Sequence, residues 1–383
     1  MNGTIYMPVG EVCSSISDTY REKKNMVTLI NTSDVLEGRV LNHERVPNSN
    51  LKGQFKKTFQ RDDILYSEIR PQNRRFAYVD FSPIDYIAST KLMVIRAKKD
   101  VVSPKYLYYF LKNSSTVAEL QLLAETRSGT FPQITFSEVA NLTIPVPSLA
   151  VQEVIVQTMQ CLEDKITCNE QINDNLQQQA MSLYAEMFLN SSDSNVTSGT
   201  LSDIAVITMG QSPSGSSYNE DGVGEVFYQG RAEFGFRFPK RRLFTTEPKR
   251  IAEAGDVLLS VRAPVGDLNI AYERCCIGRG LGAIHSKTGH SSFVLYTMFA
   301  LRSQLDVFNG EGTVFGSINR DALNAIPIDI PPVTEIDQFE VVAHPIDELI
   351  RANYEENCRL EAIRDSLLPK LMSGEIDVSA VQL

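Results

Sequence analysis

Two long stretches of the chain repeat apolar residues at alternating spacings of four and three, the heptad pattern of a helix that packs against another helix. The first seam consists of Ile155, Met159, Leu162, Ile166, Asn169, Asn173, Leu176, Ala180, Leu183 and Met187. The second consists of Phe339, Ala343, Ile346, Ile350, Asn353, Asn357, Leu360, Arg364, Leu367 and Leu371. Each helix would be on the order of 50 Å long, too long to be buried on one small domain. The pattern therefore predicts that the two helices pack on each other.

Two asparagines interrupt each seam at matching heptad positions, Asn169 and Asn173 in the first and Asn353 and Asn357 in the second. Buried polar residues in a seam reduce stability but fix register and partner. An antiparallel pairing would bring the asparagines of the two helices together, so we assign all four to the register of the helix pair. The alternative, an ordinary amphipathic helix on each domain, stays open.

The seams belong to a longer internal repeat. A shift of 184 residues superimposes like residues over most of the span 131–188, among them the pairs Phe131 and Phe315, Ile134 and Ile318, Leu142 and Ile326, Pro147 and Pro331, and Leu183 and Leu367. A looser match places Asp63–Ser67 on Asp256–Ser260 at a shift of 193. The chain is therefore two copies of a globular-then-helical unit. Such a pseudo-twofold arrangement lets one chain address two similar targets, as dimers do with paired half-sites.

The globular halves show both strand and helix patterns. Short β-branched and aromatic runs predict strands over 63–66, 92–95, 256–260 and 281–284, whereas 106–112 and 293–302 look helical. We therefore predict a mixed α/β (α+β) protein in which two long antiparallel coiled-coil helices join two globular domains. The boundaries are 1–147 for the first domain, 148–190 for the first helical spacer, 191–199 for a polar linker, 200–331 for the second domain, 332–374 for the second spacer and 375–383 for the tail.

Composition limits the location and the partners of the chain. Six cysteines without a regular framework, no leader-like amino terminus and no long apolar run predict a reducing, cytoplasmic protein with no membrane contact. The net charge of −10 would repel a nucleic acid, but the acidic excess lies in the two helical segments. The globular halves are close to neutral and contain local basic clusters. These clusters are where attraction for phosphate would arise.

The basic clusters contain the residue types that contact DNA. Arginine and lysine pair with guanine or phosphate, and asparagine and glutamine pair with adenine. The candidates in the second half are Gln229, Arg231, Arg237, Lys240, Arg241, Arg242 and Arg262. Those in the first half are Lys56, Lys57, Arg61, Arg70, Gln72, Asn73, Arg74, Arg75 and Gln133. A solvated basic loop, a surface salt bridge for Arg262, and phosphate contacts rather than base contacts remain open alternatives.

Four motifs, in this order and with this repeat, resemble the specificity (S) subunit family of type I restriction-modification systems over essentially the whole chain. They are the segments 255–266 (GDVLLSVRAPVG), 276–280 (CIGRG), 326–332 (IPIDIPP) and 367–374 (LLPKLMSG). The first half matches less closely, since its segment 63–71 is a weaker match and it lacks the CIGRG stretch. This difference fits two domains that read different half-sites.

The resemblance implies a function. Each globular half would be a target-recognition domain that reads one half of a split sequence in double-stranded DNA, with half-sites about one helical turn apart. The helix pair would be the conserved spacer that docks two methyltransferase (M) subunits, each flipping an adenine out of the stack. Two restriction (R) subunits could join through them. The methyl donor S-adenosylmethionine is expected on the partner, with no cofactor on this chain.

Catalytic alternatives find little support in the sequence. The chain has neither an Asn/Asp-Pro-Pro-aromatic loop for adenine methylation nor a Gly-x4-Gly-Lys-Ser/Thr phosphate loop, and a tight turn explains Gly278–Gly282 better than a cofactor site. Asp18, Glu22 and Lys24 poorly match a nuclease site. Adjacent Cys275 and Cys276 do not have zinc-ligand spacing with His285 and His290. We predict a non-catalytic subunit without metal; the competing class is an assembly scaffold with the same fold that does not itself read DNA.

Overall fold

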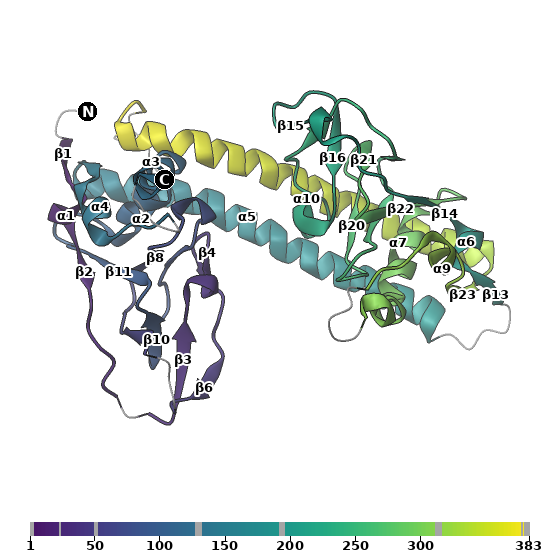
Figure 1. Cartoon of the computed structure of the whole chain (residues 1–383), viewed down its shortest axis with the longest axis horizontal. Helices are drawn as coiled ribbons and strands as arrows, with labels where there is room; N and C mark the ends of the chain where they lie inside the picture. Colours follow the sequence, from purple (N-terminus) through teal and green to yellow (C-terminus); the bar gives the residue numbers. More distant parts are fainter. Residues whose placement is uncertain are drawn as a thin grey trace. The chain divides into compact units, whose positions relative to one another are not determined.

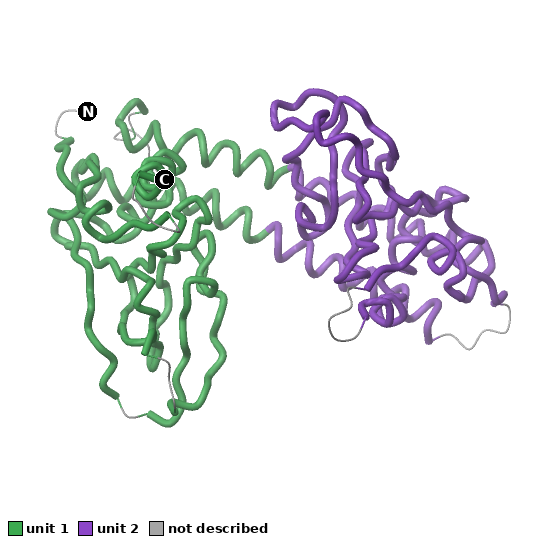
Figure 2. Tube along the Cα trace, in the orientation of Figure 1, with its two compact units in different colours: residues 1–168, 356–383 green, residues 169–355 purple. Residues whose placement is uncertain are grey.

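The computed structural model describes residues 4–22, 24–49, 53–126, 132–190, 196–310, 316–376 and 378. It divides into two compact units, which Figure 1 shows by sequence and Figure 2 by unit. Unit 1 consists of residues 1–168 and 356–383, and unit 2 consists of residues 169–355. Both boundaries fall inside the two long helices. Each unit therefore contains one globular domain and a stretch of both helices.

Unit 1 contains the first globular domain, called domain 1. Its strands are β1 (Ile5–Pro8), β2 (Cys13–Ile16), β3 (Met26–Ile30), β4 (Val35–Leu36), β5 (Arg39–Val40), β6 (Arg45–Pro47), β7 (Phe55–Lys57), β8 (Ile64–Ser67), β9 (Phe76–Tyr78), β10 (Tyr86–Ser89), β11 (Leu92–Ala97) and β12 (Thr143–Val146). Its helices are α1 (Val9–Val12), α2 (Pro104–Lys112), α3 (Ser114–Glu125) and α4 (Phe136–Asn141). The strands and the helix expected here from the sequence are confirmed.

Unit 2 contains the second globular domain, called domain 2. Its strands are β13 (Thr197–Thr200), β14 (Ala205–Met209), β15 (Tyr218–Asn219), β16 (Glu225–Tyr228), β17 (Phe244–Thr245), β18 (Ile251–Ala252), β19 (Val257–Ser260), β20 (Leu268–Ile270), β21 (Cys275–Ile277), β22 (Leu281–Ser286) and β23 (Pro327–Ile330). Its helices are α6 (Leu201–Ile204), α7 (Ser291–Ala300), α8 (Arg302–Asp306) and α9 (Arg320–Asn324). Residues 197–199, expected in the linker, belong to β13, and residues 191–195 lie outside the described part.

The two domains have the same sheet plan. Each has a four-stranded antiparallel sheet, in the order β2-β11-β8-β9 in domain 1 and β14-β22-β19-β20 in domain 2. Each has a second sheet with one parallel pair, β10 with β3 and β16 with β21. A small antiparallel pair closes each domain, β1 with β12 and β13 with β23. The internal repeat of the sequence is thus a repeat of structure, although Phe131 and Phe315 lie outside the described residues.

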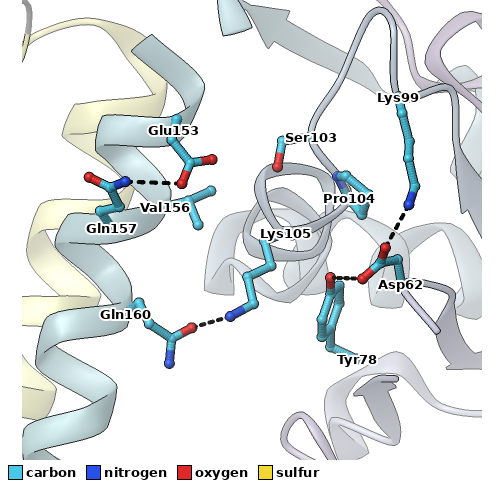
Figure 3. A pocket seen from close by; sticks show the side chains of 10 residues that line it. All are labelled: Asp62, Tyr78, Lys99, Ser103, Pro104, Lys105, Glu153, Val156, Gln157 and Gln160. Carbon is cyan, nitrogen blue, oxygen red and sulfur yellow. Dashed lines mark hydrogen bonds and ion pairs between the residues drawn. The ribbon is translucent and has the colours of Figure 1, made fainter. Parts of the chain in front are cut away.

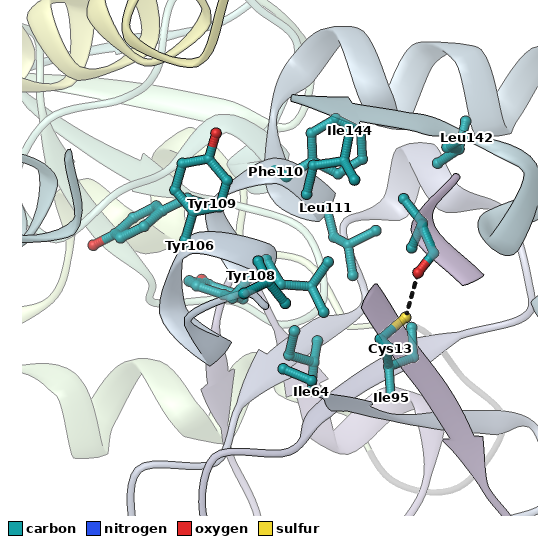
Figure 4. Packing of buried hydrophobic residues seen from close by; sticks show 14 of the residues in the cluster. Cys13, Ile64, Ile95, Tyr106, Tyr108, Tyr109, Phe110, Leu111, Leu142 and Ile144 are labelled. Atoms are coloured by element: carbon teal, nitrogen blue, oxygen red, sulfur yellow. Dashed lines mark hydrogen bonds between the residues drawn. The ribbon is translucent and has the colours of Figure 1, made fainter. Parts of the chain in front are cut away.

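The core of domain 1 forms between its antiparallel sheet and the aromatic helix α2. Tyr106, Tyr109 and Leu111 are almost completely buried there, together with Ile64 of β8 (Figure 4). Pro104 at the start of α2 has the backbone angle that a first helical turn requires. Beside this core, the thiol of Cys13 donates to the carbonyl of Val9 at 3.2 Å, and burial raises its pKa to about 12. This cysteine is a packing residue.

Both long seams form continuous helices. Helix α5 (Leu149–Tyr184) ends in a π-helical turn at Ala185–Leu189, and α10 spans Val333–Ser373. The predicted seam residues are buried or half-buried throughout, and Ile155, Met159, Phe339 and Ala343 are 0% exposed. Of the helices that the structure describes, none has the length and apolar character that crossing a membrane requires.

The helix pair is antiparallel within each unit. In unit 1, Ile155 and Met159 of α5 share a core with Leu368 and Leu371 near the end of α10. Further along α5, the carbonyl of Ile166 accepts a hydrogen bond from Asn357 at 3.4 Å. Residue numbers therefore increase along α5 in the direction in which they decrease along α10, so the two helices are antiparallel. In unit 2 the same holds, because Ala180 and Tyr184 share a core with Phe339 and Ala343.

The seam asparagines contact the opposite helix. The Asn353 side chain donates to Asn173 Oδ1 at 2.8 Å, and Asn173 donates to the carbonyl of Ile350 at 3.4 Å. Asn169 and Asn173 are 0% and 4% exposed. Because a buried amide without a partner is destabilising, these bonds favour one alignment of the helices.

A repeated carboxylate anchors each domain to a long helix. In domain 1, Glu163 of α5 accepts a hydrogen bond from the Tyr109 hydroxyl at 2.8 Å and forms an ion pair with Lys112. The Lys112 ammonium lies 4.7 Å from the centre of the Tyr109 ring. Burial lowers the pKa of Lys112, which the charge of Glu163 opposes. This cluster joins α2 to α5.

Domain 2 has the corresponding anchor 184 residues later in the sequence. Asp347 of α10 accepts from the Tyr296 hydroxyl at 2.9 Å and lies 3.4 Å from the Arg237 guanidinium. The Arg237 guanidinium lies 5.8 Å from the centre of the Tyr296 ring. Burial raises the pKa of Asp347 despite the charge of Arg237. The same tyrosine–carboxylate–cation arrangement therefore holds both domains on the helices.

We predict that Asn173→Leu or Asn353→Leu lowers the free energy of unfolding by about 1–3 kcal/mol, because each leaves a buried amide without its partner. The double variant should recover most of the loss, since both amides are removed. Urea unfolding measures this, with exposed Asn175→Leu on α5 as the control. A double variant less stable than both single variants would contradict this account of the pair.

We also predict that Tyr109→Phe and Tyr296→Phe each lower the free energy of unfolding by about 1.5–3 kcal/mol, because each removes a hydrogen bond to a carboxylate. Tyr6→Phe is the matched control, since Tyr6 is 60% exposed. Equal effects of all three substitutions in urea unfolding would show that the hydroxyl groups do not anchor the domains.

Candidate nucleic-acid interface

The central strands β8 and β19 are flanked by turns of the same geometry in both domains, one before each strand and one after it. Asp63 accepts a hydrogen bond from the backbone of Gln60 at 2.8 Å, and Asp256 accepts one from Glu253 at 2.8 Å. At the other end of each strand a serine hydroxyl donates to a carbonyl two residues on, from Ser67 at 3.3 Å and from Ser260 at 3.0 Å. The two domains thus share a backbone frame.

The frame extends to the segments beside these strands. The backbone N–H of Glu68 donates to Lys91 at 3.0 Å in domain 1, and that of Val261 donates to Gly280 at 3.0 Å in domain 2. Isolated bridges then join Ile69 to Gln133 and Arg262 to Ser317. The side chains differ, however. Lys91 contacts Glu68 and Gln133, each at 3.4 Å, whereas Arg262 occupies the place of Ile69 and is exposed.

Glycines permit close backbone approach at the corresponding edge of domain 2. A Cβ on Gly278 would lie 2.8 Å from Gln229 Cα, and one on Gly280 would lie 2.8 Å from the Gln229 carbonyl oxygen. The Leu281 N–H donates to Gly278 at 3.0 Å and closes a turn. The Gly278–Gly282 cluster is therefore a tight turn packed against Gln229.

The candidate DNA-contact residues of domain 1 differ in their exposure and in their hydrogen bonds. Lys56, Arg61, Arg70, Gln72 and Asn73 are exposed, and Lys57, Arg74, Arg75 and Gln133 are half-buried. Residues 70–74 are brought together by a short 3-10 helix at Pro71–Asn73. Arg74 donates to Ser114 at 2.9 Å, and Arg75 donates to the carbonyl of Ser33 at 3.0 Å.

Lys57 is occupied inside the domain. Its ammonium donates to the carbonyls of Thr90 at 3.1 Å and Leu92 at 2.7 Å. Burial lowers the pKa of Lys57. These bonds join β7 to the segment that leads into β11, so the structure gives this lysine a tethering role that the sequence did not indicate.

Most arginine candidates of domain 2 have carboxylate partners. Arg231 pairs with Asp267, Arg241 with Glu273, and Arg242 with Glu233 at 2.6 Å. The hydrogen bond and the charge of Glu233 raise the pKa of Arg242. Gln229, Lys240 and Arg262 are exposed as well. A DNA phosphate would therefore have to compete with these carboxylates for the paired arginines.

Arg237 departs from the sequence-based prediction of a DNA contact. It is 3% exposed and belongs to the anchor with Asp347 and Tyr296. Sequence reasoning placed it on a basic loop because its neighbours are arginine and lysine. Tyr296 lies 59 residues away along the chain and Asp347 lies further still, so local pattern could not show that Arg237 is buried.

Arg279 is the residue that sequence reasoning missed. It is exposed on the turn between Gly278 and Gly280, beside Gln229. The available signal was an arginine between two glycines, which we attributed to turn formation alone. The turn is present, and it also presents this side chain next to a candidate.

The cysteines and histidines of domain 2 are not brought together as a metal site. Cys275 and Cys276 are buried in β21, and burial raises the pKa of Cys275 to about 12. His285 contacts Asp256 at 2.6 Å, and His290 contacts Asp337 at 2.8 Å. Within the described ranges, no three side chains of histidine, cysteine, aspartate or glutamate are grouped to hold a metal ion.

Unit 1 has a hollow of about 290 Å³ between domain 1 and α5, in which Lys105 reaches Gln160 at 2.5 Å (Figure 3). On its other wall, Asp62 accepts from Lys99 at 2.6 Å and from the Tyr78 hydroxyl at 2.8 Å. Burial alone would raise the pKa of Asp62, but these bonds and the charges of Lys99 and Arg61 lower it overall. The polar groups satisfy one another, and the arrangement joins domain and helix.

The comparisons with known proteins agree with the duplicated fold. The type I restriction modification DNA specificity domain matches residues 6–178 and 193–357. The putative type I restriction enzyme MjaX specificity subunit of Methanocaldococcus jannaschii is 31% identical over 336 residues, covering 82% of this chain and 79% of that protein. The HindI specificity subunit of Haemophilus influenzae is 41% identical over 177 residues, covering 46% of this chain and 39% of that one.

A solved structure has a related fold. The crystal structure of the type I restriction-modification system S subunit from M. genitalium aligns with a TM-score of 0.54 and 16% identity, over 97% of this chain and 96% of that chain. The architecture is that of a duplicated α/β specificity protein with a helical spacer. The chain belongs to the type I restriction-modification specificity subunit family, which confirms the resemblance seen in the sequence.

We predict a pH-dependent contribution from Asp62. Because its pKa is lowered on folding, its ionised form stabilises the protein above the ordinary carboxyl pKa of 3.8, and this contribution is lost as pH falls through the folded value. Asp62→Asn should destabilise the protein at neutral pH and have a smaller effect near pH 3. Asn also tolerates the left-handed backbone at this position, where φ is 75°. Urea unfolding at both pH values tests this; an equal effect at both would contradict it.

Proposed function

We propose that this chain reads a bipartite sequence in double-stranded DNA, with each domain engaging one half-site. It does so as the specificity subunit of a complex with two methyltransferase subunits. Restriction subunits would join the complex through the methyltransferases. Membership of the family supports the specificity role.

One observation carries the proposal of DNA reading. Both domains keep the same turn around β8 and β19, while the exposed side chains on that turn differ between them. Two domains that read different DNA sequences are expected to share a backbone structure and to differ in their exposed side chains. Arginine, lysine and amide side chains at these places suit phosphate and base contacts.

The helix pair provides candidate docking surface. Its seam residues are buried, but α10 also exposes Val341, Val342, Leu349 and Ile363, which are 74%, 49%, 47% and 49% exposed. Apolar side chains on a polar helix surface are typical of protein contacts. We propose that the methyltransferase subunits bind along the helices through positions of this kind.

We further propose that the chain is not itself catalytic and that S-adenosylmethionine binds to the methyltransferase subunit. The glycine cluster at 278–282 supports this, because Gly278 and Gly280 pack directly against the Gln229 backbone. A cofactor loop would need that space open.

The competing function is an assembly scaffold that uses the helix pair and does not read DNA. The pairing of Arg231, Arg241 and Arg242 with carboxylates favours it, because paired arginines attract phosphate less. A footprint of the complex with a methyltransferase subunit on duplex DNA separates the two. Protection of two short segments separated by an unprotected or weakly protected spacer supports reading, and complex formation without protection supports the scaffold.

We predict that Gln229→Ala weakens binding at one half-site by about 1–3 kcal/mol and leaves the other half-site unchanged. Competition with duplexes that are altered in either half-site measures this. Arg274→Ala is the control, since Arg274 is exposed in the same domain, is paired with Glu225 and is not a candidate DNA contact. If Gln229→Ala weakens binding equally for all sequences, Gln229 is a phosphate contact and not a base reader.

A further inference from the structure

The arginines of domain 2 fall into two groups. Six have a carboxylate within ion-pair distance, namely Arg231, Arg237, Arg241, Arg242, Arg274 and Arg302. Arg250, Arg262, Arg279 and Arg320 are exposed, and no carboxylate of the described residues forms an ion pair with them. In a domain where most arginines are neutralised by a neighbour, the second group is the exception.

Backbone hydrogen bonds bring three members of this second group, Arg250, Arg262 and Arg279, to one edge. The N–H of Ile277 donates to Arg250 at 2.9 Å, and the N–H of Val261 donates to Gly280 at 3.0 Å, so Arg262 and Arg279 each adjoin a bonded residue. The N–H of Gly278 donates to Tyr228 at 2.8 Å. This places Gln229 beside the turn as well. We call these four residues, Gln229, Arg250, Arg262 and Arg279, the arginine edge.

Among the residues that the structure describes, no carboxylate forms an ion pair with the arginines of this edge. Like charges on neighbouring strands repel and reduce stability. Elsewhere in the domain, carboxylates offset such repulsion. An edge with three arginines and, in the described part of the chain, no acidic partner is therefore suited to an external anion. The guanidinium group binds phosphate and the acceptor edge of guanine through two parallel hydrogen bonds.

Arg279 has the position of a base reader within the arginine edge. Its turn is fixed by two glycines that admit no side chain, because a Cβ on either would lie 2.8 Å from an atom of Gln229. A rigid turn holds an arginine and a glutamine side by side, the pair of residue types that recognise guanine and adenine in the major groove. Arg250 and Arg262 flank this pair.

Domain 1 carries different residues in the same places. Lys91 there accepts the backbone bond that Gly280 accepts in domain 2, so Thr90 corresponds to Arg279. Asn31 follows β3 as Gln229 follows β16, and its side chain accepts from the backbone of Thr32 at 2.8 Å. The contact expected of Arg279 is therefore absent from this place in domain 1.

We propose that Arg279, beside Gln229, makes the base-specific contact of domain 2, to a guanine in one half-site, while Arg250 and Arg262 bind the adjoining phosphates. This inference rests on the proposed function. It adds the residue that determines specificity and the base that it recognises.

The test uses the complex of the full chain with a methyltransferase subunit, S-adenosylmethionine and a library of duplexes of random sequence. Sequencing of the methylated fraction gives the preference at each position. For the unaltered complex we expect a split motif with a guanine in one half. Arg279→Ala should reduce the preference at that position about tenfold or more and leave the other half of the motif unchanged.

Two further variants separate base reading from charge. Arg279→Lys keeps the charge but replaces the planar pair of donors by a single ammonium group, so it should weaken the guanine preference less than Arg279→Ala does. Arg274→Ala is the matched control, because Arg274 is an exposed arginine of the same domain that is paired with Glu225 and Glu253. It should keep the whole motif. Thermal unfolding of each variant verifies that the domain remains folded.

Each other outcome overturns a defined claim. Uniform loss of methylation over all sequences in Arg279→Ala, or an unchanged motif in that variant, would overturn the assignment of Arg279 and leave the proposed function standing. If the unaltered complex methylates DNA without any split motif, the proposed function and this inference both fail.

Discussion

The antiparallel packing of α5 on α10 is the constraint on which the rest of the structure depends. Neither seam could be buried by its own domain, and the amides of Asn173 and Asn353 bond to each other within the apolar interface. One consequence is that each unit contains parts of both helices. Leu368 and Leu371, near the end of the chain, complete the core of unit 1, whereas Tyr184 of α5 completes the core of unit 2. Each domain is thus stabilised by a segment distant in sequence.

The anchors explain how two domains of different surface use one helix pair. Glu163 and Asp347 occupy equivalent positions of the repeat, and each binds a tyrosine and a cation of its own domain. These contacts lie within each unit. Surface side chains can therefore differ between the domains without loss of the shared frame, as the exchange of Ile69 for Arg262 illustrates.

The sequence predicted the parts of the fold that depend on local periodicity. Heptads identified both helices, and short β-branched and aromatic runs identified β8, β11, β19 and β22. It even predicted that α10 continues through Pro345, where local rules favour a break, because the seam residues Ala343, Ile346 and Ile350 continue on both sides.

The sequence could not predict which basic residues are free. In the sequence, Arg237 and Lys57 resemble the exposed basic residues beside them, but their partners come from elements far along the chain. Arg279 was not chosen as a candidate, because the turn formed by Gly278 and Gly280 already explained the motif. Residues 197–199 resemble a linker in composition, yet they pair with β23, which lies far along the chain. In each case tertiary contacts determine the structure of the residue, and the local composition does not reveal these contacts.

The central claim is that this chain confers sequence specificity on a methyltransferase, and the most direct measurement is a map of methylated bases. Long-read sequencing of DNA from cells that express a type I methyltransferase subunit, with and without this chain, provides it. The account predicts a methylated adenine in each half of a split motif, present only when the chain is expressed. The same methylation pattern in both cultures, or none with a demonstrably active methyltransferase, would contradict it.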